Sequence, residues 1–166
     1  MNEDKWKQYL NTLNNYSGCT SEHTGHIAEF YIKHDAGNGK ILDVGCAQGN
    51  FKVNCKSEYS GIDFPDDIHE LPHDDNTFDI VFCNHVLEHV LSPVIVLTEM
   101  KRVMDKDGFM IIGVPCCPHF LSEEHFTVLT RKGWEQLFKM LSLVIEDFED
   151  KEHSLHYKLK VGKVQW

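Results

Sequence analysis

The fold is decided by the stretch ILDVGCAQGN at residues 41–50. A short apolar segment leads to Asp43, and a turn with two glycines, Gly45 and Gly49, follows at once. A strand that runs into such a turn leaves backbone N–H groups free to meet a ligand. The spacing matches neither the G-x-G-x-x-G of dinucleotide-binding proteins nor a P-loop. We therefore expect a ligand site here, and the carboxylate of Asp43 favours a cationic ligand over a pyrophosphate.

The segments on both sides of this stretch alternate between strand and helix patterns. Strands are predicted at residues 40–45, 60–64, 78–84, 108–115, 143–149 and 156–162, and helices at 3–13, 22–34, from about 50, 92–104 and 131–141. The last two strands alternate apolar and polar residues, which is typical of an antiparallel pair. Strands that alternate with helices predict an open, mostly parallel α/β sheet.

Length and charge narrow the possible functions. At 166 residues the chain is expected to be a single domain, with residues 1–35 as a helical segment before the core at 40–166. The net charge of -10 repels phosphate backbones, so nucleic acid is not expected as a partner. No apolar run approaches the ~18 residues of a membrane span, and the first residues resemble no signal peptide. We expect a cytoplasmic protein with mostly reduced cysteines, of which Cys46 and Cys83 are expected to be buried.

A second acidic residue supports a nucleotide-like ligand. Asp63 ends the predicted strand at 60–64 and follows Asp43 by about the interval at which Rossmann-type proteins place a carboxylate on ribose hydroxyls. A carboxylate accepts hydrogen bonds from both hydroxyls at once. Alternatively, Asp63 only ends the strand before Pro65.

Several segments together resemble a known family. In order, they are DVGCAQG (43–49), GIDF (61–64), LPHDDNTFDIVFCNHVLEHV (71–90), EMKRVMDKDGFMIIGVP (99–115) and EHFTVLTRKGWEQLF (124–138). They look like the class I S-adenosylmethionine-dependent methyltransferases, in the branch with small-molecule and sugar substrates. The resemblance covers about residues 40–141. It implies a Rossmann-like sheet, mostly parallel with an antiparallel C-terminal strand, and S-adenosylmethionine as the cofactor.

The resemblance also implies the residues of the cofactor site. Those around the methionine part would be Asp43, Gly45, Cys46, Ala47 and Gly49. Asp63 would hold the ribose and Phe64 the adenine ring, while Asp67 and Ile68 would meet the adenine amino group. Asn84 and His85 would lie under the methionine carboxylate and the transferable methyl group.

The sequence departs from the family pattern between Asp63 and Asp67. They are only four positions apart, whereas the family has a helix and a strand between these points. We therefore expect a sheet that lacks one edge strand and its helix. The segment at 65–72 would then close over the adenine as a loop.

Histidines are the candidates for chemistry, because their ordinary pKa suits a general base at neutral pH. The candidate catalytic residues are His85, His89 and His125, with Glu88 beside the first two. If residues 85–90 form a helical turn, His85 shares a face with Glu88 and His89. Alternatively, Glu88 and His89 only brace that turn. Cys116, Cys117 and His119 lack the spacing of a zinc site, so no metal is expected.

These observations predict a methyltransferase that acts on a small hydroxylated acceptor, such as a sugar or another metabolite. The alternative is a non-catalytic module with the same fold that binds the cofactor or a protein partner. The shortened sheet edge is also compatible with a homodimer, in which a second subunit covers it. An NAD-dependent dehydrogenase ranks third, because the Gly-rich turn does not fit it.

Overall fold

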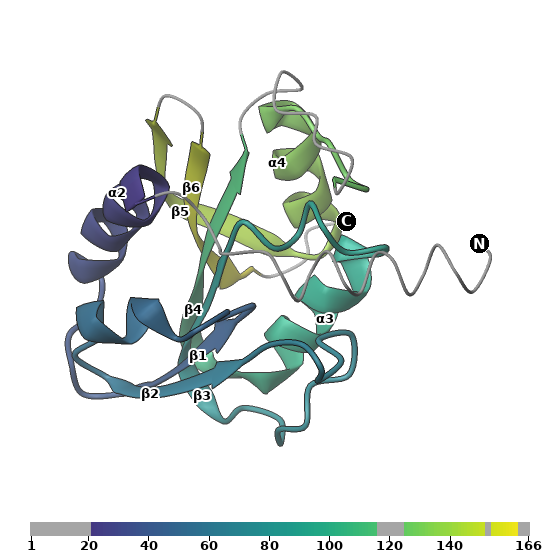
Figure 1. Cartoon of the computed structure of the whole chain (residues 1–166). Coiled ribbons are helices and arrows are strands. Elements are labelled where there is room, and N and C mark those ends of the chain that lie inside the picture. Colours follow the sequence, from purple (N-terminus) through teal and green to yellow (C-terminus); the bar gives the residue numbers. More distant parts are fainter. Residues whose placement is uncertain (1–20, 116–124, 152–153, 163–166) are drawn as a thin grey trace.

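The computed structural model describes residues 21–115, 125–151 and 154–162 (Figure 1). The helix predicted at 3–13 and the cysteines at 116 and 117 lie outside these ranges. Among the described helices, none is long and apolar enough to cross a membrane.

One six-stranded sheet organises the described chain. Its strands are β1 (Lys40–Val44), β2 (Glu58–Ile62), β3 (Phe78–Asn84), β4 (Met104–Pro115), β5 (Leu143–Lys151) and β6 (Ser154–Val161), in the order β2-β1-β3-β4-β6-β5. Strands β2, β1, β3 and β4 pair in parallel, while β6 is antiparallel to both β4 and β5. The predicted sheet with its antiparallel C-terminal pair is confirmed.

Within the described ranges, three α-helices and one short 3₁₀ helix cover the sheet. They are α2 (Ser21–Ile32), η1 (Asn50–Asn54), α3 (Pro93–Val103) and α4 (Arg131–Met140). The Oγ1 atom of Thr130 accepts a hydrogen bond from the backbone N–H of Gly133, so Thr130 is the N-cap of α4, as predicted. The helix expected from residue 50 is only a 3₁₀ helix.

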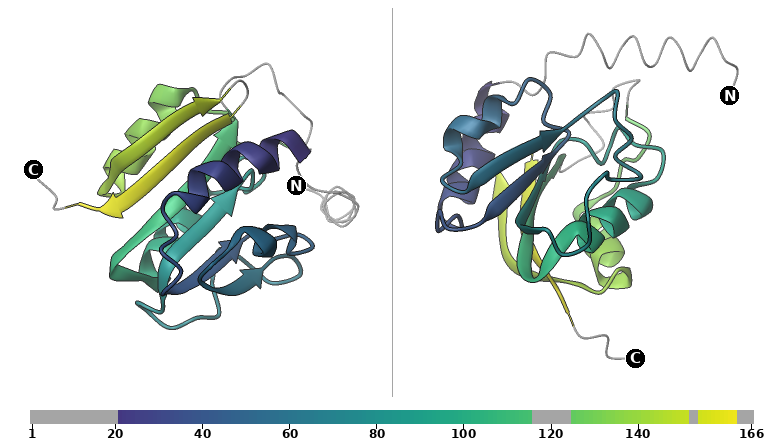
Figure 2. Two further views of the ribbon diagram at one scale, coloured as in Figure 1. Left: turned by 90° about the vertical axis from the view of Figure 1, so that its left-hand side faces the viewer. Right: turned by 90° about the horizontal axis from the view of Figure 1, so that it is seen from below.

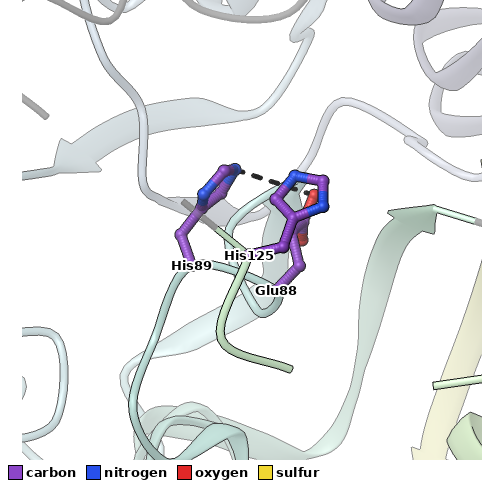
Figure 3. Close-up of side chains that lie close together, drawn as sticks. All are labelled: Glu88, His89 and His125. Carbon is purple, nitrogen blue, oxygen red and sulfur yellow. Dashed lines mark ion pairs between the residues drawn. The ribbon is translucent and has the colours of Figure 1, made fainter. Parts of the chain in front are cut away.

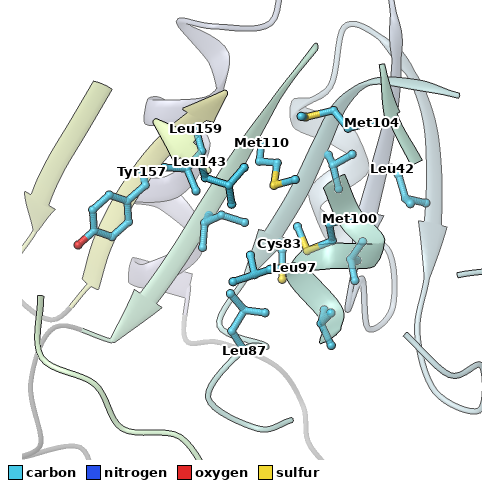
Figure 4. Close-up of a cluster of buried hydrophobic side chains, with 14 of the residues drawn as sticks. Leu42, Cys83, Leu87, Leu97, Met100, Met104, Met110, Leu143, Tyr157 and Leu159 are labelled. Atoms are coloured by element: carbon cyan, nitrogen blue, oxygen red, sulfur yellow. The ribbon is translucent and has the colours of Figure 1, made fainter. Parts of the chain in front are cut away.

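The two faces of the sheet are packed by different elements (Figure 2). Neighbouring residues of a strand point to opposite faces, so Ile80 and Phe82 pack on one side, and Val81 and Cys83 on the other. The smaller cluster lies against α2 and η1, and the larger one against α3 and α4. Figure 4 shows part of the larger cluster, including Cys83. The sheet is therefore covered on both faces, as its apolar strands require.

The prediction that the sheet lacks one edge strand and its helix is confirmed. Strand β2 is at the edge of the sheet, and the structure describes no helix or strand between Ile62 and Phe78. The largest difference from the predicted boundaries is in β4, which begins at Met104 and not at 108, and whose register against β3 shifts between Phe78 and Ile80. The polar residues 105–107 bulge out of the pairing there. Strand β2 lies two residues earlier than predicted, and β6 begins two residues earlier.

Candidate active site

The loop after β1 turns sharply and is tied to the neighbouring strand. The backbone N–H groups of Gly45 and Cys46 donate to the carbonyl oxygen of Ile62, at 2.8 and 3.2 Å. Gly45 has a φ of 80°, and a Cβ atom there would lie 2.2 Å from Cγ2 of Val86. Only glycine therefore fits between the loop and the segment after β3. Cys46, expected to be buried, is partly exposed because it belongs to this loop and not to the strand.

Asp43 lies at the carboxyl end of β1 and is 2% exposed. Its Oδ2 atom accepts a hydrogen bond of 2.7 Å from the hydroxyl group of Tyr59. Burial raises the pKa of Asp43 to about 7, and the nearby Asp63 adds to the rise, while the Tyr59 hydrogen bond opposes it. A cationic ligand beside this carboxylate would favour its ionised form.

Asp63 lies just beyond β2 and holds the same loop in place. Its carboxylate accepts hydrogen bonds from the backbone N–H groups of Ala47 and, at 2.6 Å, of Phe64. An ionised carboxylate has about four lone-pair sites, so two backbone bonds leave capacity for ribose hydroxyls. The Phe64 side chain is 40% exposed beside it, which leaves its ring available to a ligand.

The loop that follows is fixed at its two ends. Asp67 accepts a hydrogen bond from the backbone N–H of His69, which lowers the pKa of Asp67 and makes a local turn. Ile68 packs against the larger apolar cluster. Further along, the Arg102 guanidinium of α3 donates to the carbonyl oxygen of Leu71 at 2.9 Å. The loop predicted at 65–72 is thus present, with the side chain of Asp67 exposed.

The segment after β3 forms the other side of the site. Asn84 ends the strand, and His85 follows with a φ of 53°. Residues 87–89 form a turn, closed by a hydrogen bond from the backbone N–H of His89 to the carbonyl oxygen of Val86. This turn brings Nδ1 of His85 to 3.1 Å from Oε1 of the fully buried Glu88. On its other side, Nε2 of His85 lies 3.0 Å from the hydroxyl oxygen of Ser154 in β6.

The three candidate histidines surround Glu88. Nε2 of His89 lies 3.9 Å from Oε1 of Glu88, and the rings of His89 and His125 have centroids 4.8 Å apart (Figure 3). His125 comes from a distant part of the chain. It is held there because the backbone N–H groups of Phe126 and Thr127 donate to the carbonyl oxygen of Glu88, at 2.8 and 3.1 Å.

The structure therefore gathers most of the predicted residues in two groups, at the end of the sheet where the parallel strands β1, β2 and β3 have their carboxyl ends. The first comprises Asp43, Gly45, Cys46, Ala47, Gly49, Asp63 and Phe64, and the second comprises Asn84, His85, His89 and His125. They meet where Val86 abuts Gly45. Sequence reasoning missed Tyr59. Its signal was Gly61, which pairs with Asp43 and whose missing side chain leaves room for the Tyr59 hydroxyl group.

Comparisons with known proteins agree with this geometry. Residues 52–112 match the family model described as "Methyltransferase domain". An uncharacterized methyltransferase of Schizosaccharomyces pombe is 46% identical over 50 residues, which are 30% of this chain and 16% of that protein. An uncharacterized protein of Methanocaldococcus jannaschii is 28% identical over 170 residues, 88% of this chain and 70% of that protein. The chain thus matches only a small part of the yeast protein.

A solved structure has the same fold. The 1,6-didemethyltoxoflavin-N1-methyltransferase of Burkholderia thailandensis, with S-adenosylhomocysteine bound, superposes with a TM-score of 0.75 at 12% identity. The superposition covers 96% of this chain and 86% of that one. The fold is therefore that of the class I methyltransferases. Residues 52–112 thus resemble a methyltransferase domain, in a chain that has the class I methyltransferase fold.

Proposed function

We propose that this chain transfers the methyl group of S-adenosylmethionine to a hydroxyl group of a small acceptor, such as a sugar or another metabolite. The observation that carries the proposal is the meeting of two groups at one end of the sheet. The buried carboxylate of Asp43 lies at the end of β1, and a histidine cluster around Glu88 lies on the neighbouring segment. The first suits the cofactor and the second suits the activation of a hydroxyl group.

The cofactor roles follow the geometry of the loop. Asp43 would attract the positive end of the methionine part, and the backbone of residues 45–49 would line it. Asp63 would accept from the ribose hydroxyls, with Phe64 against the adenine. Asp67 and Ile68 would close the adenine end, and Asn84 with His85 would lie near the methionine carboxylate and the methyl group.

The cofactor supplies an electrophilic methyl group on a sulfonium. The acceptor oxygen forms a bond to the methyl carbon, the carbon–sulfur bond breaks, and its electron pair stays on the sulfur as a thioether. The hydroxyl proton must leave at the same time. His85, His89 and His125 lie around Glu88 and are the candidates to accept this proton, because histidine suits proton transfer near neutral pH. Holding the two reactants in line supplies much of the rate.

Calorimetry with S-adenosylhomocysteine, followed by a methylation assay, tests this function. The full chain should release heat on binding, and Asp43→Ala should not. Incubation with S-adenosylmethionine and a panel of sugars and other hydroxylated metabolites should give a methylated product detectable by mass spectrometry. Folded protein that binds no cofactor at millimolar concentration would refute the proposal. Cofactor binding without turnover on any acceptor would favour the non-catalytic module instead.

A further inference from the structure

We infer that the side chains of Glu88, His89 and His125 form a site for one divalent transition-metal ion. One nitrogen or oxygen atom from each of the three lies within 4.8 Å of the others. The sequence did not indicate this site, because His125 is far from the other two along the chain. The inference rests on the proposed function, since it names the group that activates the acceptor in the same site.

The donor set indicates the kind of ion. Two imidazole nitrogens and one carboxylate suit zinc and the neighbouring first-row metals, such as cobalt, iron(II) and manganese. Calcium and magnesium prefer sets made of oxygen atoms. Three protein ligands leave at least one coordination position for water or for a substrate oxygen, as in catalytic zinc sites.

Two polar atoms of the cluster, one on Glu88 and one on His125, have no hydrogen-bond partner among the described residues. Glu88 is fully buried, yet its Oε2 atom has no hydrogen-bond partner within the described part of the chain. The same holds there for Nδ1 of His125. A buried polar group without a partner costs about 1–3 kcal/mol, and more if it is charged. A cation between these side chains would remove that cost for both.

The distances need only small adjustments. Metal–ligand bonds of about 2.0–2.2 Å place the ligand atoms of a tetrahedral site about 3.3–3.6 Å apart. Oε1 of Glu88 and Nε2 of His89 are already 3.9 Å apart. Figure 3 shows the ring of His125 beside that of His89, on a separate segment. Because Phe126 and Thr127 bind the backbone of Glu88, the third ligand is held close by hydrogen bonds and not by chance contact.

His85 would support the site without binding the ion. Its Nδ1 atom lies 3.1 Å from Oε1 of Glu88, and its Nε2 atom lies 3.0 Å from the Ser154 hydroxyl oxygen. Such an outer partner orients a ligating carboxylate, and the loss of one typically weakens metal binding by 10–100-fold. We therefore assign His85 as a positioning residue of this cluster.

A metal ion at this position would activate the acceptor. A hydroxyl group bound to a divalent ion loses its proton more easily. Because His89 and His125 would then bind the ion and could not act as bases, the proton would pass to solvent. The oxygen would then form its bond to the methyl carbon as the carbon–sulfur bond breaks. Glu88 and His89 lie shortly after β3 in the chain. Val86, in the same segment, lies against Gly45 of the loop at residues 45–49. Acceptors that present a hydroxyl group to the ion are thus the expected class.

Cobalt(II) is a direct probe, because its bound form absorbs visible light. The full chain, freed of metal with a chelator, is titrated with cobalt(II) alone. We expect saturable absorption that zinc abolishes by displacement and magnesium does not. His125→Gln and His89→Gln should each weaken cobalt binding by more than about 10-fold, since even outer partners contribute that much. His73→Gln is the matched control, because His73 packs edge-on against Phe78, away from the cluster.

Parallel calorimetry with S-adenosylhomocysteine separates the two proposals. Wild-type chain that binds S-adenosylhomocysteine but gives no cobalt absorption overturns the metal site and leaves the proposed function standing. Cobalt affinity unchanged in both histidine variants also overturns it. If His89→Gln does not fold, His125→Gln, whose side chain is only partly buried, decides the question. Cobalt binding with no cofactor binding refutes the methyltransferase proposal but not the metal site.

Discussion

Two aspartates, Asp35 just before β1 and Asp43 near its end, are almost equally buried, at 3% and 2% exposed. Their surroundings differ. The Asp35 carboxylate accepts hydrogen bonds from the side chains of Tyr31 and Ser57 and from the backbone N–H groups of Gly37, Lys56 and Ser57. A single hydroxyl group, that of Tyr59, is the hydrogen-bond donor described for Asp43.

The pKa values move in opposite directions for that reason. Burial alone would raise the pKa of Asp35, but the hydrogen bonds, from Ser57 and Tyr31 above all, lower it well below its ordinary value. For Asp43, burial prevails and raises the pKa to about 7. A buried carboxylate with a full set of donors stabilises the fold. Asp43, with one described donor and at the carboxyl end of β1, has the surroundings expected for the cation that we propose it binds.

Asp43→Asn should have the largest effect, and it tests whether Asp43, unlike Asp35, binds the cofactor. Removing one partner of a desolvated charge pair costs about 3 kcal/mol, so affinity for S-adenosylhomocysteine should fall about 150-fold. Calorimetry measures the loss. The fold should remain, because asparagine is nearly the same size and the buried charge is gone. Asp35→Asn is the control, and equal loss of affinity in both variants would show that Asp43 has no special role.

The next largest effect concerns the loop that follows Asp43. Gly45→Ala forces a Cβ atom to within 2.2 Å of Val86, at a φ of 80°. Gly49→Ala has a similar φ of 69° but meets only the Tyr59 hydroxyl group, at 3.8 Å. Left-handed backbone costs alanine about 1–2 kcal/mol in both, and overpacking adds about 1–3 kcal/mol at Gly45 only.

Chemical denaturation of the two variants measures this difference. The free energy of unfolding should fall by about 3 kcal/mol for Gly45→Ala, roughly twice the loss for Gly49→Ala. Adding Val86→Ala should restore part of the Gly45→Ala loss, because it removes the atoms that clash. Equal losses for the two glycines, with no effect of the second mutation, would contradict the close contact between the two loops.

Asp35→Asn tests the structural half of the comparison. Hydrogen bonds to a charged group contribute about 1.5–3 kcal/mol each, and the amide keeps some of them, so we expect a loss of about 2 kcal/mol in the free energy of unfolding at pH 7. Cofactor affinity should not change. Because the pKa of Asp35 is lowered on folding, its stabilisation is present above the ordinary pKa and is lost as the pH falls below about 4. The difference in the free energy of unfolding between wild type and Asp35→Asn should therefore decrease as the pH falls below about 4.

The sequence predicted most of the sheet because each strand carries its own local pattern. The strand at 78–84 is apolar throughout, and its predicted bounds agree with β3. The missing edge strand was equally visible, since the three residues between Asp63 and Asp67 cannot form a helix and a strand. The start of β4 could not be predicted. Gly108 indicates a turn, so the strand was expected to begin there, but residues 105–107 form a bulge that depends on pairing with β3.

The residues of the candidate site also differ in whether the local sequence could predict them. Asp43 and Asp63 were predictable because the Gly-rich turn and the strand ends place them by local sequence. The Glu88 cluster was only half predictable. His85, Glu88 and His89 lie within one turn, but the arrival of His125 depends on backbone hydrogen bonds between segments far apart in the chain. The second bond of His85, to Ser154 in β6, likewise requires the folded sheet.

The smallest expected effect is a pH dependence that separates the two aspartates. With a pKa of about 7, Asp43 is mostly protonated at pH 6, and a cationic ligand binds its ionised form. Affinity for S-adenosylhomocysteine should therefore rise about fivefold from pH 6 to pH 7, where an α-ammonium group is still mostly protonated. Asp43→Asn should lack this rise. A wild-type slope no steeper than that of the variant would mean that Asp43 is already ionised at pH 6.

The stability of the cofactor-free protein should depend on pH in the opposite direction to cofactor affinity, because of Asp43. A pKa raised on folding means that the stability contributed by protonated Asp43 is present below about pH 4 and is lost as the pH rises through 7. In the cofactor-free protein, Asp43→Asn should therefore gain stability relative to wild type over that range. Asp35→Asn should lose stability relative to wild type at lower pH, as the pH rises towards about 4. The stability difference from wild type should thus change with pH in opposite directions for Asp35, before β1, and Asp43, within it.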